Sequence, residues 1–127
     1  MKGLRMSTQE VGKRLVSLCQ QGQYQQAIQE LYAEDIVSVE AAAMPGHPQT
    51  MKGKAATLEK LKWWQENNEV HSGKVVGPFP HGDRFAVLFD FDVTCKQAGR
   101  VKMVEVGIYT VKDGKITKEE FFYDMGG

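Results

Sequence analysis

The stretch that decides the fold is RFAVLFDFDVTCK, which occupies residues 84–96. Successive side chains of a β-strand point to opposite faces, so every second residue lies on the same face. One face of this segment is entirely apolar, while the other carries most of the polar residues, and this alternation is typical of a strand with one buried face. The apolar face consists of Phe85, Val87, Phe89, Phe91 and Val93. We predict a long strand that packs this face against helices.

Segments on either side predict an antiparallel meander around this strand. Turn signals rich in Gly, Pro and Asp occur at 77–83, 97–99 and 113–114, and Asp-Gly in particular favours a tight hairpin. They delimit four candidate strands. These are 70–76, 84–96, 100–112 and 115–124.

Helical patterns dominate the first half of the chain. Ser7 and Glu10 have the spacing of a capping box, in which each side chain binds a free backbone N–H at the start of a helix. An apolar stripe at helical spacing follows, Gly22 is a typical residue just after a helix end, and a second helical stripe begins at Tyr24. β-Branched residues at 36–40 predict a short strand, and Pro and Gly make 43–53 a loop.

A third helix is predicted at 54–67, with Ala55, Leu58 and Leu61 facing inward. Trp63 and Trp64 are adjacent and cannot share a helix face, so only one of them should face inward. Helices followed by a meander indicate an α+β fold, with three N-terminal helices on one face of a curved antiparallel sheet. The length of 127 residues fits a single domain at 7–127, preceded by a disordered leader at 1–6.

Composition narrows the class of protein. Lys plus Arg and Asp plus Glu both number 16, so the net charge is zero, which argues against nucleic acid and anionic membranes as partners. No apolar segment is long enough to span a membrane or to form the core of a signal peptide, so we expect a cytoplasmic protein. Two cysteines set no disulfide framework, and His47, His71 and His81 lack the spacing of a zinc site. We expect neither metal nor cofactor.

Three motifs together resemble a known family. Residues 31–35 (LYAED) run into 37–40 (VSVE), 52–56 (KGKAA) start the third helix, and 111–116 (VKDGKI) lead into 121–124 (FFYD). This order resembles the cone-shaped NTF2-like superfamily, and more closely its SnoaL-like and ketosteroid-isomerase-like members. The resemblance implies an internal pocket and allows isomerase, dehydratase or cyclase chemistry, or binding without catalysis.

The resemblance also implies roles for particular residues. Glu40 falls where ketosteroid-isomerase-like members keep their acidic general base. Leu15 and Gly107 stand where those members keep their two oxyanion donors, so steroid isomerisation is not expected. Glu105 lies one same-face position from Gly107.

Two carboxylates are therefore the leading candidates for chemistry. A carboxylate in an apolar cavity is poorly solvated and gains proton affinity, so Glu40 could act as a base near neutral pH. Its alternative role is a solvated or Lys-paired strand end. Glu105 is a candidate second acid or ligand anchor, and its alternative is a salt bridge to a Lys or Arg of the neighbouring strand.

Other residues are expected to line the pocket and bind a ligand. Tyrosines there can donate a hydrogen bond to a ligand or simply pack in the core, and His71 is the histidine expected to face the cavity. The predicted ligand-binding residues besides Glu105 are Glu119, Tyr109, Tyr123, His71, Phe89, Phe91, Met103, Phe121, Trp63, Trp64 and Leu15.

The sequence thus predicts a protein that binds a small apolar or mixed-polarity molecule. The first hypothesis is a cofactor-free isomerase or lyase in which Glu40 abstracts a proton, and the alternative is a non-catalytic ligand-binding or dimerisation module. A homodimer is expected through the outer sheet face, which is too apolar to remain in water. The outer-face residues are Leu88, Val104, Val106, Ile108 and Phe122.

Overall fold

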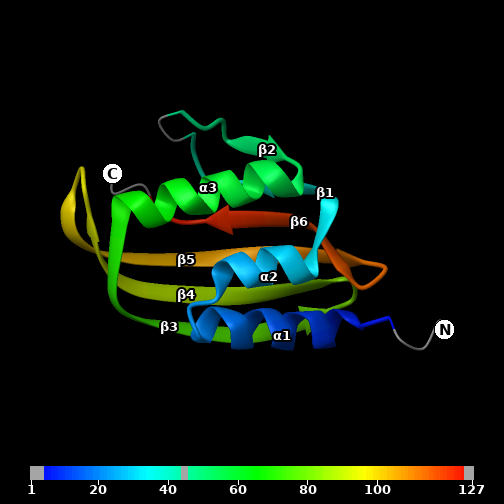
Figure 1. Ribbon diagram of the computed structural model, residues 1–127. Helices are drawn as coiled ribbons and strands as arrows, with labels where there is room; N and C mark the ends of the chain where they lie inside the picture. The colour runs from blue at the N-terminus through cyan, green and yellow to red at the C-terminus, as the bar shows by residue number, and fades with distance from the viewer. Residues whose placement is uncertain (1–4, 44–45, 125–127) are drawn as a thin grey trace.

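Three helices cover one face of a six-stranded sheet in the computed structural model, which describes residues 5–43 and 46–124 (Figure 1). The helices are α1 (Thr8–Gln20), α2 (Tyr24–Leu31) and α3 (Lys54–Asn67). The strands are β1 (Tyr32–Val39), β2 (Thr50–Lys52), β3 (Asn68–His81), β4 (Arg84–Cys95), β5 (Gly99–Lys112) and β6 (Lys115–Phe122). The predicted α+β class is confirmed.

The sheet has the strand order β2-β1-β6-β5-β4-β3. Neighbouring strands are antiparallel with one exception, because β1 and β6 pair in parallel. The prediction of an antiparallel sheet therefore holds for the meander and is wrong for this pair. The pairing places Ser38 of β1 beside Glu119 of β6, which brings the first and last strands together at the candidate site.

The predicted buried face of β4 forms the centre of the core. Phe85, Val87, Phe89 and Val93 are at most 5% exposed, and Phe91 is partly buried against them. The helices contribute the opposite layer of this core, mainly through α1 and α2. The strand-face pattern thus identified the face that meets the helices.

The predicted capping box begins α1. The Ser7 hydroxyl accepts a hydrogen bond from the Glu10 backbone N–H at 3.1 Å, and the Ser7 N–H donates to the Glu10 carboxylate at 2.9 Å. Arg5 and Met6, the described part of the predicted leader, contact the domain: Arg5 pairs with Asp113 at 2.8 Å, and Met6 packs on the core. Residues 1–4 and 125–127 lie outside the described residues. The boundary between leader and domain that the sequence suggests therefore stays a prediction.

Two predicted loops are shorter than expected. Residues 77–81 continue β3 after a bulge between Val76 and Phe79, so the turn is confined to Gly82 and Asp83. Strand β3 is at the sheet edge, where proline is tolerated because the ladder needs no N–H there. The predicted loop at 43–53, of which 44–45 lie outside the described residues, contains the short strand β2.

Helix α3 has the predicted bounds, and two of the three residues predicted to face inward, Leu58 and Leu61, pack against the core. Ala55 is exposed, whereas Thr57 and Lys60 are buried, 2% and 7% exposed respectively. With Leu61 and Trp64 they form an i, i+3, i+4, i+7 stripe toward the sheet. The inward face of α3 therefore carries a lysine, and this lysine is central to the site.

Candidate functional site

A cavity of about 160 Å³ lies between the helices and the sheet. For scale, an engineered apolar cavity of roughly 150 Å³ holds a benzene molecule. Most of the wall is apolar or aromatic, and a few polar groups project from it. Ten of the predicted site residues line it: Leu15, Glu40, Trp64, Phe89, Phe91, Met103, Glu105, Tyr109, Glu119 and Phe121.

Three predicted site residues do not line the cavity. His71 is exposed and lies 2.7 Å from the Thr94 hydroxyl, because the face of β3 that carries it turns outward. Trp63 does not line the cavity, and its ring packs edge-on against that of His47 with 5.4 Å between the ring centroids. Trp64 is therefore the inward tryptophan of the pair. Tyr123 also lies outside the lining, but it contacts Glu40.

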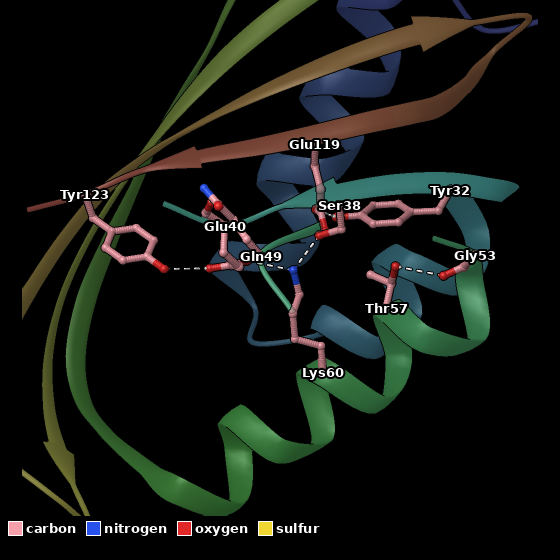
Figure 2. Close-up of polar contacts among 9 residues, drawn as sticks. All are labelled: Tyr32, Ser38, Glu40, Gln49, Gly53, Thr57, Lys60, Glu119 and Tyr123. Atoms are coloured by element: carbon pink, nitrogen blue, oxygen red, sulfur yellow. Dashed lines mark hydrogen bonds and ion pairs between the residues drawn. The ribbon is translucent and has the colours of Figure 1, made fainter. Parts of the chain in front are cut away.

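Lys60 lines the cavity and is the centre of a polar network (Figure 2). It reaches from α3 to β1, where its ammonium donates hydrogen bonds to the Ser38 hydroxyl and, at 2.7 Å, to Glu40. Only 9% of the Lys60 side chain and 11% of the Glu40 side chain are exposed. A buried ammonium costs free energy unless it is paired, so these acceptors are what allow a lysine at this position.

Glu119 extends the network behind Ser38. The Ser38 hydroxyl donates to this carboxylate at 2.6 Å, and the Tyr32 hydroxyl donates to its other oxygen. Burial raises the pKa of Glu119, while the positive charge of Lys60 and the two hydroxyl donors act in the opposite direction. Glu119 is 2% exposed and is fully engaged by protein groups.

Glu40 lies one residue beyond the end of β1, at the rim of this network. Its backbone is pinned to Gln49, because the Glu40 N–H donates to the Gln49 carbonyl at 2.9 Å and the Gln49 amide donates back at 3.0 Å. Tyr123 donates its hydroxyl to the second carboxylate oxygen at 3.0 Å, as Figure 2 shows. Glu40 is therefore fixed on both sides, by Lys60 and Tyr123, while still lining the cavity.

Glu105 differs from the other two carboxylates. Within 5–43 and 46–124 it has neither a hydrogen bond nor an ion pair, so the alternative of a salt bridge to the neighbouring strand is wrong, and the side chain lines the cavity instead. The nearby cations Arg100 and Lys102 pair with Asp92 and Asp90 on the opposite sheet face. Burial, reinforced by the charges of Glu40 and Glu119 and opposed by Lys60, raises the pKa of Glu105 to about 7.

Tyr109 stacks on Phe85 with 4.9 Å between the ring centroids and is 2% exposed. Its hydroxyl has no hydrogen-bond partner in the part of the chain that the structure describes, and burial keeps the pKa of this phenol well above its usual value. Gly107 makes room for it: a Cβ there would lie 2.8 Å from the Tyr109 ring and 3.1 Å from the Phe121 ring. The Tyr109 hydroxyl occupies the same space, 3.1 Å from that Cβ position.

Lys60, Ser38 and Tyr32 belong to the polar network but were not predicted as site residues from the sequence. Helical spacing contained a signal for Lys60, because it lies on the same face as Leu61 and Trp64. Period-two spacing likewise places Ser38 and Glu40 on the face of the buried Ile36. The prediction for α3 used only its apolar residues and the one for β1 used only Glu40, so Lys60 and Ser38 were missed.

The described ranges contain neither a cluster of metal-ligating side chains nor a membrane-spanning helix. No group of three or more His, Cys, Asp or Glu side chains there is arranged to hold a metal ion. None of the helices there combines the length and apolar character that a membrane span needs. Both cysteines are free, and burial raises the pKa of the Cys19 thiol to about 12.

Three helices on a curved sheet around a cavity with buried carboxylates define a small α+β fold built around a ligand-sized pocket. The chain belongs to the family with a SnoaL-like domain, whose model matches residues 6–123. The family resemblance predicted from the motifs is confirmed. Among curated proteins, none matches the sequence.

Solved structures agree with this assignment. A Mesorhizobium loti protein named as a SnoaL-like polyketide cyclase, with carbohydrate phosphatase in brackets, is 49% identical, with a TM-score of 0.87 over 93% of this chain and 100% of that one. An NTF2-like protein of Burkholderia thailandensis is 16% identical, with a TM-score of 0.80 over 94% and 92% of the two chains. A Catenulispora acidiphila protein with a ketosteroid-isomerase-like fold, solved with trimethylamine, is 17% identical, with a TM-score of 0.70 over 91% and 86%. The predicted NTF2-like fold is confirmed.

Proposed function

We propose that the protein binds a small, mostly apolar molecule in the cavity and catalyses a cofactor-free proton transfer on it, with Glu40 as the general base. The reaction class is isomerisation, elimination or ring closure. The observation that carries the proposal is the position of Glu40, a cavity-lining carboxylate held by Lys60 and Tyr123. Proton abstraction from carbon is common to all three reaction classes, and the base must lie within hydrogen-bond reach of the substrate.

The similarity to the Mesorhizobium loti protein supports this choice. That protein bears the name of a polyketide cyclase, and 49% identity over nearly the whole chain is high enough to suggest related chemistry. The cavity volume of about 160 Å³ favours a compact substrate over a polycyclic one. Leu15 and Gly107 provide no side-chain donor for an oxyanion, which is why steroid isomerisation is not proposed.

In this mechanism Lys60 and Tyr123 orient the Glu40 carboxylate toward the cavity. Each donates to a different oxygen, at 2.7 and 3.0 Å, and the ion pair with Lys60 can strengthen again when Glu40 returns the proton. Most of the cavity wall is apolar or aromatic, and surroundings of low polarity strengthen electrostatic interactions inside the cavity. Glu40 would take the proton, and Lys60 and Tyr123 would act as positioning residues.

A Glu40→Gln variant tests the proposal. It keeps the shape of the side chain and should abolish turnover of a substrate found by screening small carbonyl compounds, while the affinity for that substrate changes little. Glu59→Gln, on the exposed face of α3, is the matched control and should keep full activity. Unchanged turnover in Glu40→Gln would remove Glu40 from the role of base.

The second candidate function is ligand binding without catalysis. It is favoured by the same contacts, since both Glu40 oxygens already accept hydrogen bonds from protein groups. Tight binding of a ligand that wild-type protein leaves chemically unchanged over hours, followed by NMR, would select this candidate.

We further propose a homodimer through the outer sheet face. Val76, Leu88, Val106 and Phe122 are register partners in a row across four strands, and Val104 beside them is 50% exposed. Contiguous exposed apolar surface of this kind marks interaction sites. Phe122→Lys should convert a dimer to a monomer in analytical ultracentrifugation, whereas Val104→Ile should leave the dimer intact. A monomeric wild-type protein at micromolar concentration would refute the proposal.

The cytoplasmic location expected from the sequence stays a prediction.

A further inference from the structure

We propose that the cavity selects ligands carrying a positively charged amino group, which Glu105 and Tyr109 bind from strand β5. This inference names a ligand class for the cavity in the proposed function. It depends on the cavity binding a small molecule and not on Glu40 acting as a base.

Glu105 is the carboxyl of the cavity that has no partner among the described residues. Glu40 and Glu119 each accept two hydrogen bonds from protein groups. Glu105 lines the same cavity and accepts none from any residue in the described ranges. Glu105 is partly buried in a mostly apolar cavity, where a carboxyl without a hydrogen bond is poorly solvated, so a donor supplied by a ligand would satisfy it.

The Tyr109 hydroxyl gives a second, independent indication at the same place. Tyr109 is 2% exposed, yet its hydroxyl is also unpaired among the residues that the structure describes. The side chain of Tyr109 lies over Gly107, and its hydroxyl oxygen is 3.1 Å from the position that a Cβ of Gly107 would occupy. Gly107 separates Tyr109 from Glu105 on this face of β5, so the hydroxyl extends toward the Glu105 side. An ammonium group could donate to the phenolic oxygen and to the carboxylate together.

Aromatic walls favour the same ligand chemistry. Phe89 faces Glu105 directly across the β4–β5 ladder, and Phe91 and Trp64 line the cavity as well. Faces of aromatic rings attract cations, most strongly where water is excluded. The cavity already contains such a contact, since the Lys60 ammonium lies 5.5 Å from the centroid of the Phe121 ring.

The charges that line the cavity also favour a cationic ligand. Glu40, Glu105 and Glu119 line the cavity, and Lys60 is the cation among the described lining residues. Fully ionised, the cavity would have an excess of negative charge, and this repulsion contributes to the raised pKa of Glu105. A cationic ligand would relieve the repulsion, whereas an anionic ligand would increase it.

The test compares benzylamine with benzyl alcohol, which have nearly the same size and shape but differ in charge. Calorimetric titration of the wild-type protein at pH 8, where the Glu105 carboxyl is ionised, should give at least about tenfold tighter binding of the amine, as expected for a charge-assisted hydrogen bond. Glu105→Gln should remove the preference while leaving the affinity for the alcohol within about threefold. Glu59→Gln is the matched control and should retain the preference.

Wild-type protein provides a second measurement that needs no variant. Lowering the pH from 8 to 5.5 protonates Glu105, so the affinity for benzylamine should fall at least about tenfold. At pH 7 the binding of benzylamine should release protons, because the cation favours the ionised form of the carboxyl. Other ionisable groups among the described residues also line the cavity. They are Cys19 of α1, Tyr24 of α2, Tyr32 of β1, Lys60 of α3, Glu40 beyond β1, Tyr109 of β5 and Glu119 of β6, whereas the β4 residues of the lining are phenylalanines. Loss of the pH dependence in Glu105→Gln assigns it to Glu105 and not to Glu119, whose pKa is also raised.

The outcomes separate the two proposals. Equal binding of both probes, or a preference that survives in Glu105→Gln, overturns the inference and leaves small-molecule binding intact. Binding of neither probe overturns the inference and removes support for the ligand cavity itself. A preference for the amine in a protein that turns over none of the screened carbonyl compounds supports the inference. That result would count only against the proposed proton transfer.

Discussion

Replacing Lys60 with methionine removes the one buried cation of the polar network while keeping a side chain of similar length. The ammonium donates to Ser38 and Glu40 and lies in a cavity wall where only 9% of its side chain is exposed. Removing one partner of a buried ion pair leaves the other charge uncompensated, which typically costs about 3–5 kcal/mol. Glu40 is still held by Tyr123, so we expect the lower part of this range, about 3 kcal/mol at pH 7.

The loss should depend on pH in a defined direction. A carboxyl whose pKa is raised in the folded state contributes stability that is complete below its unfolded pKa and is lost as the pH rises through its folded pKa. Glu119 and Glu105 are of this kind, and Lys60 lowers the pKa of both. Removing Lys60 raises both folded pKa values further, so Lys60→Met should be more damaging at pH 8 than at pH 5.

Urea denaturation of wild type and Lys60→Met at pH 5, 7 and 8 gives the free energies of unfolding that test this prediction. Lys62→Met, on the exposed side of α3, is the control and should change the free energy of unfolding by less than about 0.5 kcal/mol. Adding Glu40→Gln to Lys60→Met should restore about 1 kcal/mol or more, because it removes the unpaired charge. A loss below about 1 kcal/mol that is the same at all three pH values would refute the reasoning.

Three smaller predictions use other parts of the structure. Gly107→Ala should lower the free energy of unfolding by about 1–3 kcal/mol in chemical denaturation, since its Cβ would lie 2.8 Å from the Tyr109 ring; an unchanged midpoint would show that the ring moves freely. Glu105→Gln should flatten the fall in melting temperature between pH 5 and 8, because the wild-type carboxyl, with a pKa of about 7, loses its stabilising protonated form in that interval. Ser7→Ala should cost about 1 kcal/mol by removing the cap shared with Glu10, and circular dichroism melts that overlay with wild type would contradict this.

Much of the fold could be predicted because each element carries a local signal. The alternation in β4, the capping box at Ser7 and Glu10, and the Asp-Gly turn at 113–114 depend on neighbouring residues only. The parallel pairing of β1 with β6 could not be predicted in this way, because it joins segments about eighty residues apart. The continuation of β3 through two prolines was missed for a related reason, since proline in a strand depends on whether that strand lies at the sheet edge.

Apolar residues of the site were easier to predict than its polar network. Phe89, Phe91, Met103 and Phe121 line the cavity because strand alternation already placed them on the inner face. Lys60 was missed because a lysine on a helix is usually solvent-exposed, and its burial depends on two distant acceptors, the Ser38 hydroxyl and the Glu40 carboxylate. His71 was assigned to the cavity from its strand alone, and the actual face of β3 could not be known before its bulges were seen.

The formal net charge of zero conceals an uneven distribution between surface and interior. The outer face of the meander pairs its charges, as in Arg100 with Asp92 and Lys102 with Asp90. The cavity instead contains more carboxyl groups than ammonium groups, and Glu105 remains unpaired among the described residues. A fold selected only for stability would gain by replacing Glu105 with an apolar residue, since its burial disfavours the charged form. The free energy spent on this carboxyl is therefore best explained by a ligand or a proton that it binds.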